Sequence, residues 1–237
     1  MLGNFTYSNP TKLYFGKDSL NGLNEELPKY GKNVLLVYGS GSIKKNGIYD
    51  EVIKILKANN KEIFEDAGVM PNPTVEKLYE GWLRAKKGNV DFILAVGGGS
   101  VCDYAKAVSV SVHCKEDPWD KYYLRMEDVD NEIIPVGCVL TMVGTGSEMN
   151  GGSVISNEKT QEKLAFGHPL LVPVFTFEDP TLTFSVSKYQ TAAGATDIVS
   201  HLLEQYFSSH NDDGLPDRLT EAMMINVINY KKKAVLE

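Results

Sequence analysis

DFILAVGGGSVCDYAK, at residues 91–106, is the stretch of sequence from which the fold can be worked out. Residues 91–96 are mostly apolar, which predicts a buried strand, and they lead directly into three glycines. A helix is expected to begin near Ser100 and to turn Val101, Ala105 and Val108 toward the sheet. A strand that passes through a glycine turn into a helix is typical of a parallel sheet with helices on both faces.

The same alternation recurs along the chain. Strands are expected at 33–38, 61–65, 91–96, 133–140, 153–156 and 172–177, and helices at 47–58, 74–87, from about 100 onward, 187–207 and 216–233. The predicted fold class is therefore α/β, with a Rossmann-like, mostly parallel sheet flanked by helices and followed by an all-helical segment. The change from alternating strands and helices to helices alone places the expected domain boundary near residue 180.

Composition excludes several classes of protein. The net charge of -7 argues against nucleic acid, which requires a basic surface. No stretch approaches the roughly 18 apolar residues of a membrane span, and the N-terminus shows no signal peptide. Three cysteines without metal-like spacing, Cys102, Cys114 and Cys138, are interpreted as free buried thiols in a reducing compartment. We therefore expect a cytoplasmic protein without a membrane or nucleic-acid partner.

Three loops that follow buried strands are candidates for holding a phosphate. In the first, Gly98, Gly99 and Ser100 allow close approach of a phosphate to the backbone at the start of a helix. A tight turn that only joins strand to helix is the alternative, but three consecutive glycines are costly for that purpose. Another of the three loops, TMVGTGSE at 141–148, offers hydroxyl groups. For this loop, phosphate binding and a purely structural turn are equally good interpretations.

The second loop, GSGS at 39–42, resembles the start of a dinucleotide fingerprint but lacks the third glycine. The segment Tyr38 to Ser40 contains no acidic residue, and Lys44 and Lys45 follow closely. Because an acid at this position favours the ribose hydroxyl of NAD and repels a 2′-phosphate, NADP is the better prediction, with NAD still possible.

One pair of residues suggests a metal site. Asp197 and His201 are spaced i, i+4 on an expected helix, so their side chains point the same way. A carboxylate and an imidazole suit Fe(II) or Zn(II). The alternative is a surface hydrogen bond, which is the commoner meaning of such a pair. The small residues at 192–195 would allow a ligand to approach, but two protein ligands are too few to hold a catalytic metal firmly.

The order of four motifs carries a family resemblance. The motifs are GGGSVCDYAK (97–106), TMVGTGSE (141–148), DPTLTFSVS (179–187) and AAGATDIVSHLLEQY (192–206). Together they resemble the iron-containing (group III) alcohol dehydrogenase family. YGSGSIKKNG at 38–47 and PNPT at 71–74 further resemble its NADPH-dependent butanol dehydrogenase and aldehyde reductase branch, and the match runs over nearly the whole chain.

The resemblance implies a dinucleotide-binding domain at 1–180 and, at 181–237, the first helices of a metal-binding domain of dehydroquinate synthase-like architecture. It implies that the adenosine 2′-phosphate is surrounded by Gly39, Ser40 and Ser42. The pyrophosphate would be held by Gly98, Gly99 and Ser100, with Asp103 ordering the loop behind it. The pyrophosphate and nicotinamide ribose would also contact Thr141 and Thr145, and the cofactor cleft would be lined by Asn72, Asn150 and Lys163. Asp197 and His201 match the first two of four metal ligands.

The implied reaction is hydride transfer between NADP(H) and a primary alcohol or aldehyde such as butanol or butanal, with the metal acting as a Lewis acid on the substrate oxygen. A homodimer is expected. The chain ends at Glu237, before any residue that could supply the last two histidine ligands. The resemblance therefore implies a fragment or a truncated gene product, with weak metal binding and impaired turnover. The alternatives are a non-catalytic nucleotide-binding module and an NAD-dependent polyol dehydrogenase of the same superfamily.

Overall fold

The computed structural model describes residue 4, residues 6–208 and residues 214–236. Contacts divide the chain into two compact units. We call the first the α/β unit; it comprises Asn9–Met142 and Gly146–Phe184. We call the second the helical unit; it comprises the described residues before Asn9, the short segment Val143–Thr145, and Ser185 onward. The boundary of independent domains near residue 180 stays a prediction.

The α/β unit is built on a six-stranded parallel sheet with the strand order β1-β8-β5-β4-β2-β3. Its strands are β1 (Lys12–Phe15), β2 (Asn33–Tyr38), β3 (Glu62–Asp66), β4 (Phe92–Gly98), β5 (Val136–Met142) and β8 (Phe175–Glu178). A separate antiparallel pair is formed by β6 (Gly152–Asn157) and β7 (Glu162–Gly167). The predicted α/β class with a mostly parallel sheet is confirmed.

Three details differ from the sequence prediction. The strand expected at 133–140 begins only at Val136, because Pro135 has no N–H with which to extend the ladder. The strand expected at 153–156 lies outside the main sheet, in the hairpin with β7. The edge strand β1 and the hairpin strand β7 were not predicted; β1 is mostly exposed and β7 has mixed burial, so neither has a long buried apolar run.

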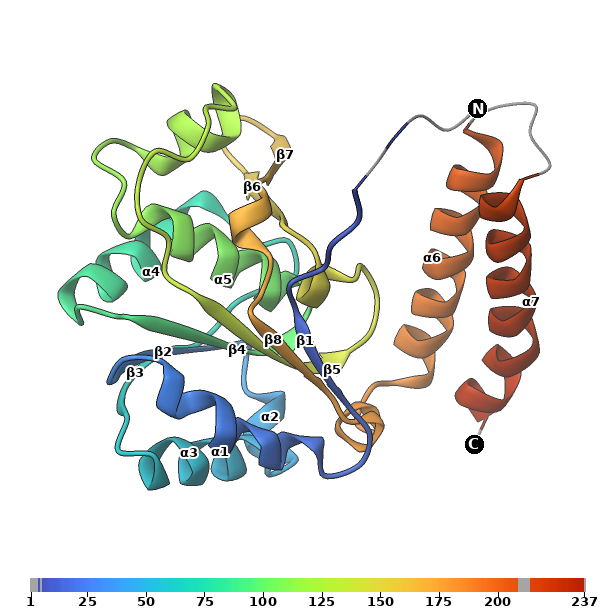
Figure 1. Cartoon of the computed structure of the whole chain (residues 1–237), viewed down its shortest axis with the longest axis horizontal. Helices are drawn as coiled ribbons and strands as arrows, with labels where there is room; N and C mark the ends of the chain where they lie inside the picture. The colour runs from blue at the N-terminus through green and yellow to red at the C-terminus, as the bar shows by residue number, and fades with distance from the viewer. Residues whose placement is uncertain (1–3, 5, 209–213, 237) are drawn as a thin grey trace. The chain divides into compact units, whose positions relative to one another are not determined.

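Helices cover both faces of the sheet (Figure 1). One face carries α4 (Val75–Lys87) and α5 (Gly99–Ser111), and the other carries α1 (Leu23–Glu26), α2 (Ser42–Lys45) and α3 (Ile48–Ala58). Short 3-10 turns lie at Ser19–Gly22, Leu27–Lys29, Ser147–Met149, Pro169–Leu171 and Pro180–Thr183, and a π turn lies at Trp119–Leu124. Each face has its own buried apolar cluster, so the central strands are buried on both sides.

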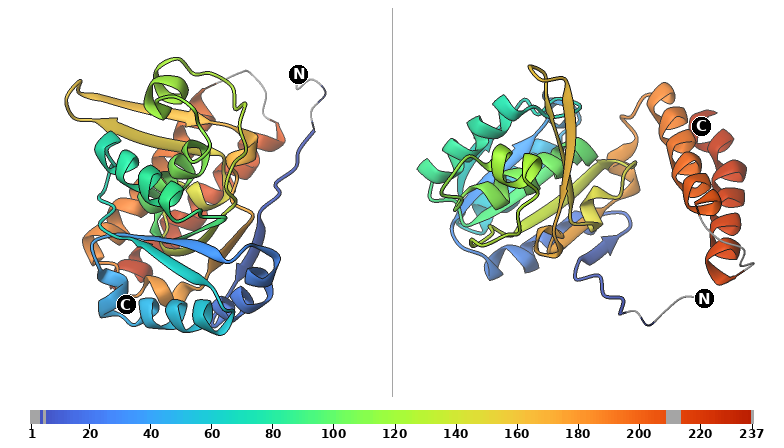
Figure 2. Two further views of the ribbon diagram at one scale, coloured as in Figure 1. Left: turned by 90° about the vertical axis from the view of Figure 1, so that its left-hand side faces the viewer. Right: turned by 90° about the horizontal axis from the view of Figure 1, so that it is seen from above.

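The period of two along β2 explains these two clusters. Leu35 and Val37 belong to the cluster under α4 and α5, while Val34 and Leu36 belong to the cluster under α1 and α3. The hairpin β6–β7 packs on the α5 side, where it is seen projecting in both views of Figure 2. The three cysteines are free and buried, as predicted.

The strand order changes direction at one position in the sheet. After β2 the chain moves outward to β3, but it then returns to the other side of β2 for β4 and continues to β5. The helices that follow β2 and β4 therefore leave on opposite faces. Such a topological switch point at the carboxyl ends of parallel strands is where ligands bind in α/β sheets.

The helical unit consists mainly of α6 (Lys188–Phe207) and α7 (Leu215–Leu236), which pack against each other. They agree closely with the helices expected at 187–207 and 216–233. The N-cap of α6 is Ser187, whose side chain accepts a hydrogen bond from the Gln190 N–H. Within the described residues, no helix is both long and apolar enough to cross a membrane.

Candidate functional site

The glycine turn after β4 provides a bare helix N-terminus at the switch point. A Cβ on Gly97 would lie 2.5 Å from the Val101 side chain, so only glycine allows α5 to start so close to the strand. Gly98 is the N-cap of α5 and has no side chain to satisfy the first N–H groups. The first turn, which includes Gly99 and Ser100, contains no acid, so the arrangement suits an anion.

A buried polar cluster lies behind this turn. The Asp103 carboxylate accepts a hydrogen bond from the Ser147 hydroxyl. The Lys106 ammonium donates to the Ser147 carbonyl at 2.8 Å and to the carbonyl and Oδ1 of Asn150 at 3.1 and 3.2 Å. It also lies 3.7 Å from Asp103 Oδ1. The first turns of α5 are thereby fastened to the loop at 147–150, which joins Asp103 and Asn150 in one network.

Burial affects both charges of this cluster. It raises the pKa of Asp103, although the hydrogen bond from Ser147 and the charge of Lys106 oppose this effect. It lowers the pKa of Lys106. Lys106 was not among the predicted site residues. The signal was a lysine three residues after Asp103 on a helix face that otherwise carries small and apolar residues.

The PNPT loop and β7 meet although they lie far apart in the sequence. The Lys163 ammonium donates to Asn72 Oδ1 at 2.8 Å. Asn72 has a left-handed φ of 55°, and the Ser156 N–H donates to the Pro73 carbonyl, so the loop is fixed against β6. Two of the residues assigned to the cofactor cleft are thus in direct contact.

The loop after β2 lies beside the loop after β3. The Gly68 N–H donates to the Gly39 carbonyl, and the Val69 N–H donates to the Tyr38 carbonyl. Gly41 has a φ of 115°, which glycine adopts without strain. Ser42 begins α2, so Gly39, Ser40 and Ser42 form a short turn at the carboxyl edge of the sheet, next to the turn after β4.

An acidic group lies near this turn, although the segment from Tyr38 to Ser40 contains none. Glu65, in β3, accepts hydrogen bonds from the hydroxyls of Tyr38 at 2.5 Å and Tyr49 at 2.6 Å. Its Oε2 lies 3.6 Å from the Lys44 ammonium. Lys44, one of the two lysines that favoured NADP, therefore has an acidic partner, and the choice between NADP and NAD stays a prediction. Only the pairing of β2 with β3 brings Glu65 to this place.

The hydroxyl-rich loop is divided between the two units. Thr141 lies in β5 and is part of the α/β unit, one strand away from β2 on the far side of β4. Thr145 belongs to the helical unit. The structure therefore brings the glycine turns, Asp103, Thr141 and Asn150 together in one unit, and it leaves the contribution of Thr145 as a prediction.

The predicted metal pair lies on α6. His201 Nε2 is 3.8 Å from Asp197 Oδ1, and each side chain is 50% exposed. A shallow hollow of about 500 Å³ on the same helix is lined by Tyr189, Ala192, Ala193, Thr196, Asp197 and Ser200. The described residues contain no group of three or more potential ligands. The donor types suit a divalent ion, but the two residues provide only half of a catalytic set.

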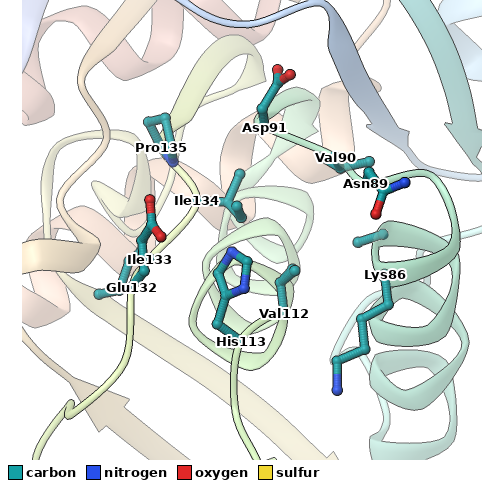
Figure 3. Close-up of a pocket in the computed structure, with 11 residues that line it drawn as sticks. Lys86, Asn89, Val90, Asp91, Val112, His113, Glu132, Ile133, Ile134 and Pro135 are labelled. Atoms are coloured by element: carbon teal, nitrogen blue, oxygen red, sulfur yellow. The ribbon is translucent and has the colours of Figure 1, made fainter.

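A second hollow, of about 420 Å³, lies at the opposite edge of the sheet (Figure 3). It is lined by the ends of α4 and α5 and by the segments that precede β4 and β5. His113 stands near its middle, beside Val112 and Ile134. Because these segments enter the strands at their amino ends, the hollow is separate from the glycine turns at the carboxyl edge.

Comparison with known sequences identifies the family. Residues 10–180 match the profile described as "Iron-containing alcohol dehydrogenase". The chain is 47% identical over 232 residues to the probable NADH-dependent butanol dehydrogenase 1 of Bacillus subtilis, covering 98% of this chain and 59% of that protein. It is 37% identical to the NADPH-dependent aldehyde reductase YqhD of Escherichia coli, covering 100% of this chain and 60% of that protein.

The fold has close counterparts among solved structures. The crystal structure of NADH-dependent butanol dehydrogenase A from Thermotoga maritima superposes with a TM-score of 0.91 at 39% identity, covering 97% of this chain and 57% of that one. The chain thus spans about three fifths of the length of the relatives that it matches. It belongs to the iron-containing alcohol dehydrogenase family.

Proposed function

We propose that the α/β unit binds a nicotinamide dinucleotide and that the protein transfers a hydride between this cofactor and a primary alcohol or aldehyde of the butanol and butanal type. The observation that carries the proposal is the bare N-terminus of α5 at the switch point between β2 and β4. The family relationship supports it, since the relatives include named butanol dehydrogenases and an aldehyde reductase.

The residues have distinct proposed roles. The turn at Gly98, Gly99 and Ser100 binds the pyrophosphate through backbone N–H groups, and Asp103 with Lys106 holds the adjoining loop in place. The turn at 39–42 holds the adenosine end. A bound nicotinamide ring supplies the hydride donor or acceptor, and the protein supplies its position and a dry environment.

The metal is the less complete part of the proposal. Asp197 and His201 would contribute two ligands to a divalent ion, which would polarise the substrate oxygen. Both side chains are half-exposed and no third ligand lies beside them among the described residues, so these two groups alone would hold an ion weakly. A homodimer in the cytoplasm remains part of the proposal.

Cofactor and substrate can be tested together. The purified chain is mixed with NADPH or NADH, dissociation constants are measured from cofactor fluorescence, and oxidation is followed with butanal, with and without Fe(II) or Zn(II). The expected result is binding of dinucleotide with low or absent turnover. A longer form of the protein, if the gene continues, should reduce butanal in a metal-dependent way, and glycerol serves as the comparison substrate for the polyol dehydrogenase alternative.

Each other outcome is informative. Absence of binding for both cofactors would contradict the proposed site. Binding without turnover in every form would favour a non-catalytic nucleotide-binding module. Unchanged metal content and activity on Asp197→Ala in the longer form would eliminate the metal-dependent mechanism.

A further inference from the structure

We infer that the ion pair between Lys44 and Glu65 sets the preference of this protein between NADH and NADPH. The inference rests on the proposed function, because it takes the turn at 39–42 as the adenosine end of the site. It goes beyond that function by assigning cofactor selection to two residues outside the glycine turn.

The carboxylate of Glu65 is held by groups that do not depend on Lys44. Each of its oxygens accepts a hydrogen bond from a tyrosine hydroxyl, Oε2 from Tyr38 and Oε1 from Tyr49. Burial alone would raise the pKa of Glu65, but these hydrogen bonds and Lys44 outweigh it, and its pKa is lowered. Glu65 is therefore a fixed negative charge beside the turn.

The cation is held more loosely. The Lys44 ammonium is 3.6 Å from Glu65, and the two side chains are 48% and 41% exposed. It lies 4.3 Å from the centre of the Tyr49 ring and 5.1 Å from that of Tyr38. A half-exposed ion pair contributes little to stability, so Lys44 can leave Glu65 for a stronger anion at small cost.

A 2′-phosphate would change the balance of this pair. Lys44 belongs to α2, which begins at Ser42 and directly continues the adenosine turn. A phosphate in that turn attracts Lys44 while the two tyrosines keep Glu65 satisfied, but the same carboxylate repels the phosphate. A ribose 2′-hydroxyl carries no charge, so it is neither attracted by Lys44 nor repelled by Glu65 in this way. The pair thus lets both cofactors bind and limits the preference for the phosphorylated one.

The experiment isolates the adenosine end from the nicotinamide and the metal. Adenosine 2′,5′-bisphosphate and 5′-AMP differ only in the 2′-phosphate, so the ratio of their dissociation constants, measured by calorimetry, reports the selection. Glu65→Gln, which retains a hydrogen-bond acceptor, should shift this ratio toward the bisphosphate about five-fold, and Lys44→Met should shift it about as far in the opposite direction.

The double variant tests whether the two residues act as a pair. If Glu65 restrains Lys44, Glu65→Gln should gain less bisphosphate affinity in the Lys44→Met background than alone, whereas independent charges would give multiplicative effects. Glu62→Gln is the matched control. It is the same substitution on the same strand, at the opposite end, where Glu62 pairs with Lys32.

Failure of the proposed function and failure of the inference would give different results. If the unaltered chain binds neither NADH, nor NADPH, nor either adenosine nucleotide, the proposed function itself is contradicted. Normal binding of both dinucleotides, with a bisphosphate to AMP ratio that changes less than two-fold in Glu65→Gln and Lys44→Met, would overturn the inference alone. A shift toward AMP in Glu65→Gln would also overturn it.

Discussion

The α/β unit and the helical unit differ in how they are stabilised. The α/β unit has buried clusters on both faces of its sheet, with aromatic contacts such as Phe92 against Phe175. In the helical unit α6 has no buried residue and α7 has one, Thr220, among those described. Large apolar side chains on the two helices are exposed, including Phe207, Leu219, Met223, Ile225 and Ile228.

This difference bears on the proposed nucleotide-binding turns and on the proposed metal pair, each considered within its own unit. The proposed nucleotide-binding turns of the α/β unit follow paired strand ends, and a buried polar cluster holds the adjoining loop. Asp197 and His201 lie on a helix that has no comparable support. Preorganisation is what makes a small set of polar groups effective, so we expect nucleotide binding to be the stronger property of this chain.

The largest expected effect is in the core of the sheet. Phe175→Ala removes a fully buried ring and should lower the free energy of unfolding by about 3–5 kcal/mol. The same substitution at Phe207, which is 77% exposed on α6, should change it by less than about 0.5 kcal/mol. Denaturant unfolding followed by circular dichroism measures both. Equal costs would contradict the contrast between the two units.

The buried lysine gives the next effect. Lys106→Met removes the donor to the carbonyls of Ser147 and Asn150 and leaves Asp103 without its cation, which should cost about 2–3 kcal/mol. It should also weaken NADH and NADPH binding alike, because the loop at 147–150 loses its anchor. Lys54→Met, on an exposed face of α3, is the control. An unchanged stability and affinity would show that the cluster does not hold the loop.

An acid titration tests a single carboxylate of the α/β unit. Burial alone would raise the pKa of Glu26, but hydrogen bonds from Lys29, Tyr14 and Lys12 outweigh it and lower the pKa to about 2. A lowered folded-state pKa contributes stability above the unfolded value of about 4.5, and this contribution is lost as the pH falls toward 2.

Glu26→Gln should therefore cost about 2 kcal/mol near neutral pH and progressively less below about pH 4.5. Urea unfolding of both forms across this range measures the difference. A cost that stays constant with pH would mean that Glu26 acts through packing and not through its charge.

The smallest effect is expected at the metal pair. Because Asp197 and His201 are half-exposed and provide only two ligands, a modest molar excess of Zn(II) over the protein should stabilise the chain by less than about 1 kcal/mol, and Asp197→Ala should abolish that gain. Thermal unfolding with and without the ion measures it, with Asp217→Ala on α7 as the control. Tight stoichiometric binding by the unaltered chain would show that further ligands complete the site.

Much of the fold could be predicted because its signals are local. The apolar run at 33–38 coincides with β2. The glycines at 97–99 lie where the strand was predicted to pass into a helix: β4 ends at Gly98 and α5 begins at Gly99. The strands that were missed lack such a signal. Among the described strands, Lys12–Phe15 pairs with β8 alone, at the edge of the sheet, and most of its residues are exposed.

The candidate site was predictable only in part. The glycine and hydroxyl motifs could be assigned from their order in the sequence, but their partners could not. Lys106 is completely buried. Because a fully buried lysine is uncommon, sequence patterns favour an exposed side chain. Glu65 lies in a strand whose neighbour in the sheet had to be known before its contact with Tyr38 and Lys44 could be found.

The sequence by itself determined the class of fold, the family and the loops at the carboxyl edge, because apolar periodicity, glycine turns and the order of motifs are properties of the chain alone. Tertiary structure decided which of those loops lie together. Contacts such as Lys163 with Asn72, Lys106 with Asn150 and Glu65 with Lys44 join elements whose proximity depends on strand order and register. Strand order is set by packing across the whole sheet, and no local pattern encodes it.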